Sequence, residues 1–174
     1  MYSKGVVMSQ DMVHVKYHVG RFSISDNKAS FSVVGVVEKI EKRVSPVFWI
    51  FFDSLHDEQS VSMEFNSIGI RSFAFALKTR FKDKNFKYST QTGGNVTVKN
   101  LNIFTANNLA YIGVTHKGIT LSVSLQEFEL LGLASELEFL VASTVEATYK
   151  TQQLIERKKQ HNKVENEHDT QNKQ

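Results

Sequence analysis

The apolar residues of this chain follow a strand-like period and then a helix-like period, and this pair of patterns occurs twice. The segment "VHVKYHV", residues 13–19, alternates apolar and polar side chains, which is typical of a half-buried strand. Between Ser67 and Lys82, apolar residues recur at intervals of three and four, which predicts an amphipathic helix. Alternation resumes at residue 86 and gives way to a second helical pattern after Ser124. Strands followed by a helix, repeated once, constrain the fold more than any other feature.

The same patterns predict where strands bend and where helices begin. The apolar parity of the first strand switches after Gly20, so we expect a β-bulge at Gly20 and Arg21. A capping-box sequence, S-L-Q-E from Ser124, predicts the start of the second helix. We expect this helix to be interrupted or bent near Gly132 and to end at about Lys159.

These elements predict an α+β fold built from two ββββα repeats packed about a pseudo-twofold. Two strand-rich halves that each end in a helix can close one shared core. We therefore expect a single domain over residues 1–159, with halves at about 14–84 and 85–159. Residues 160–174 lose all apolar periodicity, which predicts a disordered polar tail after the long second helix.

Composition limits the location and the class of protein. The 174 residues include no cysteine, which removes disulfides and thiolate metal sites. The N-terminus lacks the apolar stretch of a signal peptide, and the longest apolar run, Val47 to Phe52, is far below the roughly 20 residues that span a bilayer. We expect a cytoplasmic protein without a membrane partner. The net charge of +3 is a weak excess, so any anion-binding surface must come from local clustering.

Alternation also predicts which side chains point away from the core. In the second half these are Lys99, Asn102, Phe104, Tyr111, Thr115 and Lys117. In the first half they are Lys16, His18 and Arg21, with Trp49 as a further candidate because its strand is apolar on both faces. Flat rings for bases and cations for phosphates are what a sheet needs to bind a single-stranded nucleic acid.

Each of these features also has a purely structural interpretation. Trp49 and Phe51 could be core residues, and Tyr111 could only cap the edge of the core. Four cations lie near the C-terminal end of the first helix, where they interact favourably with the negative end of the helix dipole. The same cations could instead contact phosphates. The cluster is formed by Lys78, Arg80, Lys82 and Lys84.

Metal and catalytic sites are not expected. His14 and His18 lie on a strand, where four residues span about 13 Å at roughly 3.3 Å per residue, too far for one metal ion. The chain carries no nucleophile elbow, P-loop, dinucleotide fingerprint or zinc-protease motif. We therefore expect neither a cofactor nor an enzymatic activity.

The segment "HKGITLSVSLQEFELL" resembles single-stranded nucleic-acid-binding coactivators of the positive-cofactor-four type. Their signature is similar to Lys117, Gly118, Ile119, Thr120 and Leu121 at the last strand, followed by Phe128 and Leu131 in the helix. The doubled arrangement looks like the Whirly fold, in which two ββββα repeats in one chain replace two coactivator subunits.

The resemblance implies binding of single-stranded DNA or RNA across the sheets. We expect DNA rather than RNA, with low sequence specificity, and a homo-oligomer, either a dimer or a tetramer. The alternative is a protein-interaction or structural module that oligomerises through the long C-terminal helix. A sheet face that carries Lys16, Arg21, Lys99 and Lys117 together favours nucleic acid, whereas neutral sheets with an apolar stripe on the helix favour a protein partner.

Overall fold

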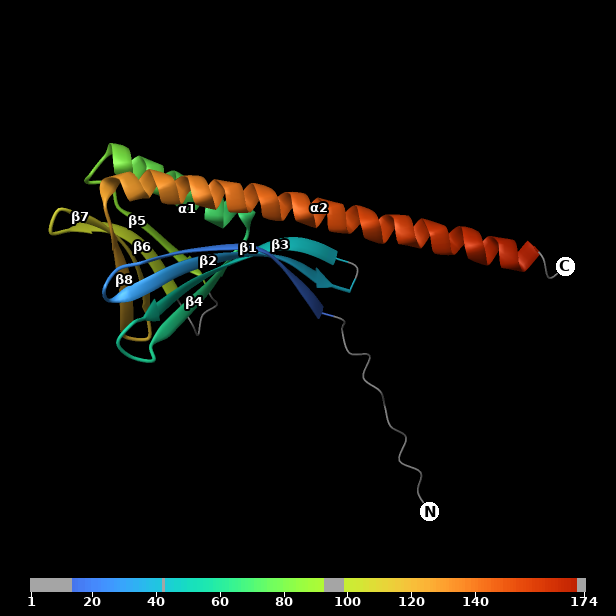
Figure 1. Cartoon of the computed structure of the whole chain (residues 1–174), viewed down its shortest axis with the longest axis horizontal. Coiled ribbons are helices and arrows are strands. Elements are labelled where there is room, and N and C mark those ends of the chain that lie inside the picture. Colours follow the sequence, from blue (N-terminus) through green and yellow to red (C-terminus); the bar gives the residue numbers. More distant parts are fainter. Residues whose placement is uncertain (1–13, 42, 93–98, 172–174) are drawn as a thin grey trace, which may run out of the picture.

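The computed structural model describes residues 14–41, 43–92 and 99–171, which form two four-stranded sheets and two helices (Figure 1). The first half contains β1 (His14–Ser25), β2 (Ala29–Ile40), β3 (Arg43–Ser54), β4 (Ser60–Phe65) and α1 (Ser67–Lys82). The second half contains β5 (Tyr88–Thr92), β6 (Lys99–Ala106), β7 (Leu109–His116), β8 (Ile119–Leu125) and α2 (Glu127–Gln171). The predicted order, ββββα repeated once, is confirmed.

Each sheet is an antiparallel meander in which neighbouring strands are consecutive in the sequence. Sheet 1 has the order β1-β2-β3-β4 and sheet 2 the order β5-β6-β7-β8. Two equivalent hydrogen-bonded contacts join the halves. Asp26, in the turn between β1 and β2, bonds to Ser124 on β8, and Lys99, the first residue of β6, bonds to the backbone of Ser62 on β4. Each half thus joins its first hairpin to the other half's last strand, as a pseudo-twofold requires.

The first strand contains a β-bulge, one residue earlier than the sequence predicts. The register with β2 shifts between His18 and Gly20, so the extra residue is Val19. Gly20 instead pairs with Gly35, and both glycines lie beneath α2. A Cβ atom on Gly35 would lie 2.3 Å from Thr144 Oγ1, so the helix backbone can approach the sheet only because this residue has no side chain.

Helix α1 has the bounds that the spacing predicts. Asn66 is its N-cap and accepts a hydrogen bond on Oδ1 from the backbone N–H of Gly69 at 2.8 Å. The apolar stripe faces the core, where Ile70, Phe73 and Leu77 are fully buried. The helix ends where the backbone N–H of Asp83 donates to the Thr79 carbonyl.

The start of α2 differs from the predicted capping box. Ser124 belongs to β8, and the helix begins three residues later at Glu127. The side chain of Glu129 reaches back to accept a hydrogen bond from the backbone N–H of Gln126 at 2.6 Å. Ser124 does not cap the helix because it is a strand residue two positions before the last residue ahead of α2, and its hydroxyl donates to Asp26 at 3.0 Å.

Helix α2 is continuous for 45 residues, about 68 Å at ~1.5 Å per residue. The interruption expected at Gly132 does not occur, since one glycine in a helix interior costs only about 1 kcal/mol. The helix also continues to Gln171, where the sequence predicted a disordered tail from residue 160. Missing apolar periodicity shows that a segment has no packing partner, but Lys, Glu and Gln still favour helical backbone. Figure 1 shows this part of α2 extending beyond both sheets.

The core lies between the inner faces of the two sheets and the helices. Phe31, Phe48, Ile50 and Phe52 enter it from sheet 1, as do Val61, Met63 and Phe65 of β4. From sheet 2 it receives Leu101, Ile103, Ile112 and Val114, and from α2 it receives Leu130, Leu133, Leu137 and Val141. One apolar cluster spans both halves, so neither half has a core of its own.

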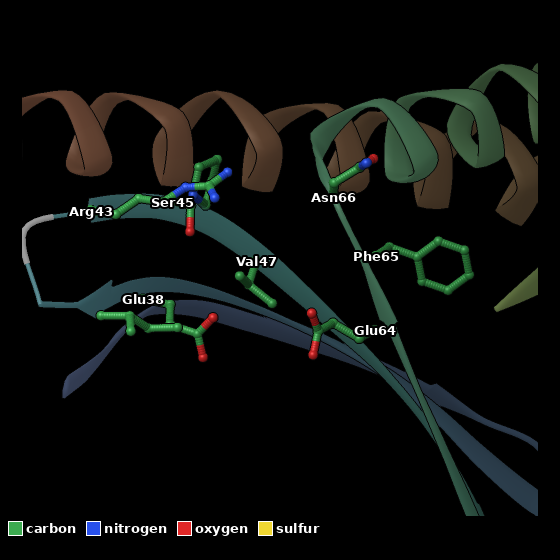
Figure 2. A pocket seen from close by; sticks show the side chains of 9 residues that line it. Glu38, Arg43, Ser45, Val47, Glu64, Phe65 and Asn66 are labelled. Carbon is green, nitrogen blue, oxygen red and sulfur yellow. The ribbon is translucent and has the colours of Figure 1, made fainter. Parts of the chain in front are cut away.

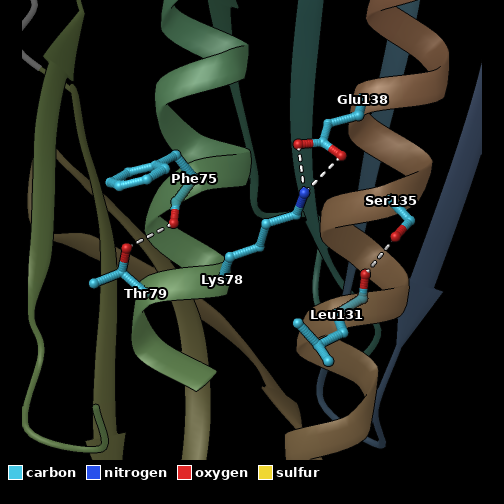
Figure 3. A network of polar contacts seen from close by, with 6 residues as sticks. All are labelled: Phe75, Lys78, Thr79, Leu131, Ser135 and Glu138. Atoms are coloured by element: carbon cyan, nitrogen blue, oxygen red, sulfur yellow. Dashed lines mark hydrogen bonds and ion pairs between the residues drawn. The ribbon is translucent and has the colours of Figure 1, made fainter. Parts of the chain in front are cut away.

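The two helices lie side by side and antiparallel in one layer (Figure 1), and ion pairs join them. Lys78 Nζ on α1 donates to both carboxylate oxygens of Glu138 on α2, at 2.6 and 2.7 Å (Figure 3). Lys84, just past the end of α1, pairs with Glu127 at 3.0 Å. Arg80 is buried, with Nε donating to Thr105 Oγ1 at 3.1 Å. Most of the predicted cation cluster is therefore used inside the fold. Among the described residues, no helix combines the length and apolar character that a membrane span needs.

Candidate nucleic-acid interface

The outer face of each sheet, opposite the core, carries most of the residues predicted to bind, with Lys99 and Lys117 as exceptions. Strand pairing places Asn102, Gly113 and Ser122 in one row across sheet 2, with Asn100, Thr115 and Thr120 in the next row. Ser89 and Gln91 extend these two rows onto β5. None of the described residues in these rows is charged. This face therefore offers hydroxyl and amide groups rather than ions.

An aromatic pair adjoins these rows. Phe104 on β6 and Tyr111 on β7 lie directly opposite each other, with ring centroids 5.2 Å apart and planes 10° apart. The absence of a side chain at Gly113 leaves room for the Phe104 ring, since a Cβ atom there would lie 3.1 Å from Phe104 Cε1. Both rings are half-buried, and neither belongs to the core cluster. The pair provides a flat apolar surface of the kind on which a base can stack.

The predicted residues at the end of sheet 2 take two different positions. Thr115 is on the outer face, where its hydroxyl lies 3.4 Å from that of Thr120 on β8. Lys117 lies in the turn between β7 and β8 with a φ of 48°, followed by Gly118 at 81°. Its exposed side chain therefore extends from the end of the sheet rather than from its face.

The orientation predicted for Lys99 is wrong. Lys99 has the same strand parity as Leu101, which is fully buried, so it starts β6 on the inner face. Its ammonium group donates a short hydrogen bond to the backbone carbonyl of Ser62 on β4. Lys99 looks outward only when alternation is counted from Val96 and Val98, which lie outside the described residues. Lys99 joins the two sheets instead of facing solvent beside Phe104.

The outer face of sheet 1 has a second aromatic pair, with a cation over it. Trp49 and Phe51 project from β3 to this face, with ring centroids 6.3 Å apart and planes 26° apart. Lys16 Nζ on β1 lies 5.3 Å from the Trp49 ring centroid and 3.3 Å from a carboxylate oxygen of Glu38. Trp49 is half-buried and lies outside the core cluster, so the structure favours the outward alternative. Lys16 is already paired with both a ring and a carboxylate.

His18 and Arg21 also reach the outer face of sheet 1, as predicted. His18 pairs across the strands with Val36, and Arg21 pairs with Val34. The guanidinium of Arg21 donates through Nη2 to the hydroxyl of Ser32 at 3.3 Å. Both side chains are exposed on the strand at the edge of the sheet.

Carboxylates make one end of this face unsuitable for phosphates. A pocket of about 300 Å³ is lined by Glu38 from β2, Arg43 from β3 and Glu64 from β4, with Asn66 at the start of α1 (Figure 2). Because Lys16 also pairs with Glu38, two carboxylates and two cations meet here and leave no net positive charge for a phosphate, whereas the described residues of the polar rows in sheet 2 include no carboxylate. The outer face of sheet 2 is therefore the better candidate for contact with a nucleic acid.

Sequence reasoning missed the polar residues of the outer rows in sheet 2, because no charge or ring marks them. They are Ser89, Gln91, Asn100, Thr120 and Ser122. The available signal was the alternation of β8, "ITLSVSL", whose polar residues all fall on one parity. No group of three or more metal-ligating side chains is close enough to hold an ion within the described part of the chain.

A partly buried junction holds the turn between β1 and β2 against the edge of this face. Asp26 Oδ2 accepts hydrogen bonds from the backbone N–H and the hydroxyl of Ser124, at 2.9 and 3.0 Å. Partial burial raises the pKa of Asp26, but hydrogen bonds from Ser124, Ala29 and Lys28 outweigh burial and hold that pKa below its usual value of 3.8. The ionised carboxylate of Asp26 therefore holds the turn in place.

Comparison with known proteins identifies the fold. No protein-family model matches the chain, and no curated protein sequence matches it. The structure is similar to that of the plant transcriptional regulator PBF-2, with a TM-score of 0.54 and 12% sequence identity, over 80% of this chain and 88% of that one. It is also similar to WHY1 from Arabidopsis thaliana, with a TM-score of 0.50 and 11% identity, over 74% of this chain and 85% of that one. The Whirly-like fold expected from the sequence is confirmed.

Proposed function

We propose that this protein binds single-stranded nucleic acid, preferentially DNA, across the outer face of sheet 2 and without catalysing a reaction on it. The observation that carries the proposal is the parallel pair of Phe104 and Tyr111 beside uncharged polar rows. Single strands expose base faces that stack on flat rings, whereas a duplex hides those faces inside its own stack. The resemblance of residues 117–121 to the coactivator signature supports the same proposal.

The uncharged polar rows support binding that depends only weakly on the base sequence of the nucleic acid and on salt concentration. A side-chain amide presents a donor beside an acceptor, and rotating the amide by half a turn exchanges them. Asn100 and Asn102 can therefore pair with the edge of any base, which gives affinity without a preferred sequence. Because the rows carry no cation, phosphate contacts come only from the rim, for example from Lys117. If about three phosphates are contacted, the log–log salt slope is roughly −2.

We also propose that the helix layer joins copies of the chain into a homo-oligomer. Four large apolar side chains on the helices are strongly exposed: Ile68 (75%), Phe75 (69%), Phe128 (74%) and Phe139 (71%). Exposed apolar patches of this kind mark association sites on soluble proteins. The helix layer lies opposite the outer sheet faces, so assembly through it leaves those faces accessible.

The alternative function is a protein-interaction module that uses only this helix layer. The same exposed residues and the uncharged rows of sheet 2 favour it, but the aromatic pair on the outer face of sheet 2 would then have no role. Fluorescence anisotropy with labelled thirty-base single-stranded DNA, the matching RNA and the duplex separates the two functions. We expect the single strands to bind more tightly than the duplex, and DNA more tightly than RNA. Equal or tighter binding of duplex, or no binding at low salt, would favour the interaction module.

A further inference from the structure

A small pocket opens on the edge of sheet 2, where β5 begins. It has a volume of about 410 Å³ and is lined by Lys87, Tyr88, Ser89, Asn102, Ile103 and Phe104. Pairing between β5 and β6 ends at Tyr88 opposite Ile103, so no strand covers the edge of β6 at Phe104. The short edge strand thus creates a recess on a sheet face that is otherwise covered by paired strands.

Three kinds of chemical group meet in this recess. Phe104 contributes an aromatic ring, and Asn102 contributes an amide from the adjoining outer row. Lys87 contributes an exposed ammonium group, which makes no ion pair within the described part of the chain. The lining contains no carboxylate. A ligand with a flat ring, polar ring edges and a negative charge matches all three groups.

We propose that this pocket holds one nucleotide of the bound strand. The inference rests on the proposed function and adds a discrete subsite to it. The base lies against Phe104, Asn102 bonds to the edge of the base, and Lys87 contacts the phosphate. A volume of about 410 Å³ falls within the range of roughly 300–1,000 Å³ of small-molecule sites. The remaining bases of the strand continue along the face toward Tyr111.

The pocket can be tested apart from the rest of the face with adenosine monophosphate, adenosine and inorganic phosphate as probes. In a nitrogen–proton NMR titration of the full chain, the monophosphate should shift the signals of Ser89, Asn102 and Phe104. Adenosine should shift the same signals with lower affinity, whereas phosphate alone should not shift them as a group. Asn102→Ala should weaken both adenosine ligands about fivefold, the loss expected for one net hydrogen bond.

Lys87→Ala provides the sharper comparison. It should reduce the affinity for the monophosphate to that for adenosine and leave adenosine unchanged. Lys82→Ala, which removes an exposed lysine on α1 outside the pocket, is the matched control and should change neither. Circular dichroism should show the same fold for all three variants.

A competition experiment links the pocket to the strand. A thirty-base single strand should displace the monophosphate. Lys87→Ala should make the log–log salt slope for the strand less negative by about 0.7, the value of one lost phosphate contact. If the strand binds but Lys87→Ala and Lys82→Ala behave alike, the pocket assignment is wrong and the proposed function stands. If the monophosphate binds in the pocket but no strand binds, both fail, because the pocket would then serve a free nucleotide.

Discussion

The carboxylate of Asp26 and the backbone and hydroxyl of Ser124, 98 positions later, form two hydrogen bonds of 2.9 and 3.0 Å between the halves of the chain. The other carboxylate oxygen accepts from the backbone N–H groups of Lys28 and Ala29, at 2.7 and 3.0 Å. One side chain therefore fixes both the turn between β1 and β2 and its junction with β8. The stability of the shared core depends on this junction because neither half closes a core alone.

Asp26→Asn should destabilise the protein by about 1–2 kcal/mol at neutral pH, since hydrogen bonds to a charged acceptor are stronger than neutral ones. The folded pKa of Asp26 is lowered, so its contribution is complete above the unfolded pKa of about 3.8 and is lost as the pH falls through the folded value. The difference between wild type and variant should therefore shrink as the pH falls below about 3.8. Urea unfolding at a series of pH values measures it.

Two further substitutions check the origin of this effect. Ser124→Ala removes the hydroxyl but keeps the backbone donor, so it should cost about half as much as Asp26→Asn. Glu64→Gln alters an exposed carboxylate on the outer face of β4, away from the junction, and should change stability little. A pH-independent difference between wild type and Asp26→Asn would show that the charge of Asp26 contributes nothing.

Gly35→Ala should destabilise the protein by about 1–3 kcal/mol, the usual cost of overpacking. The new Cβ atom would lie 2.3 Å from Thr144 Oγ1, so α2 must move away from sheet 1. Gly132→Ala is the matched control, because no atom lies within 4 Å of a Cβ there. In a helix interior this change should stabilise by about 0.5–1 kcal/mol. Thermal unfolding at low protein concentration measures both, and a loss at Gly132 equal to that at Gly35 would contradict this packing.

Replacing Lys99 by alanine should change stability, whereas replacing Lys117 should change the salt dependence of binding. Lys99→Ala breaks the bond to the Ser62 carbonyl, so it should lower the free energy of unfolding by about 1–2 kcal/mol while leaving the salt slope of binding unchanged. Lys117→Ala removes an exposed cation from a turn, so it should leave the free energy of unfolding unchanged. It should make the log–log salt slope of binding less negative by about 0.7. Urea unfolding and anisotropy titrations at several salt concentrations separate the two. A reduced slope for Lys99→Ala would place its ammonium group on the nucleic acid.

The sequence predicted the elements well where a period is long and regular. The spacing from Ile70 to Leu77 predicts α1, because one apolar stripe must face the core at 3.6 residues per turn. Strand alternation likewise predicted the outward position of Tyr111, whereas it leaves Trp49 open because its strand is apolar on both faces. Features that depend on contacts distant in the sequence were missed. Ser124 has the letters of a helix cap, but β8 continues through it to Leu125, and the Ser124 hydroxyl instead donates to Asp26 of the other half.

The candidate site was only partly predictable for a related reason. Lys99 is predicted to point outward by counting from residues 96 and 98, whereas within β6 it shares the parity of the buried Leu101. The polar rows through Asn100 and Asn102 carry no distinctive residue type, so only strand pairing reveals that they form a face. The pocket beside Lys87 arises from the short length of β5, which is a property of the sheet rather than of any residue.

Tyr111→Ala should weaken binding of single-stranded DNA by about tenfold or more, since stacking on an aromatic ring contributes about 1–3 kcal/mol per base. The salt slope should not change, because no phosphate contact is lost. Tyr111→Phe keeps the ring and should bind almost as well as wild type, which makes it the matched control. Anisotropy titrations of the three proteins at two salt concentrations give both quantities. If Tyr111→Ala binds as tightly as wild type, the strand does not use the Phe104 and Tyr111 pair.

Phe139→Asp should reduce the size of the assembly without unfolding the chain. The Phe139 side chain is 71% exposed on α2, so an aspartate there costs little in a single chain but is costly inside an apolar interface between copies. Leu55→Asp is the control, since Leu55 is 52% exposed in the turn between β3 and β4, away from the helix layer. Light scattering should give the unchanged protein and Leu55→Asp a multiple of the 19.8 kDa chain mass, and Phe139→Asp a smaller mass. A single-chain mass for the unchanged protein at micromolar concentration would refute the homo-oligomer.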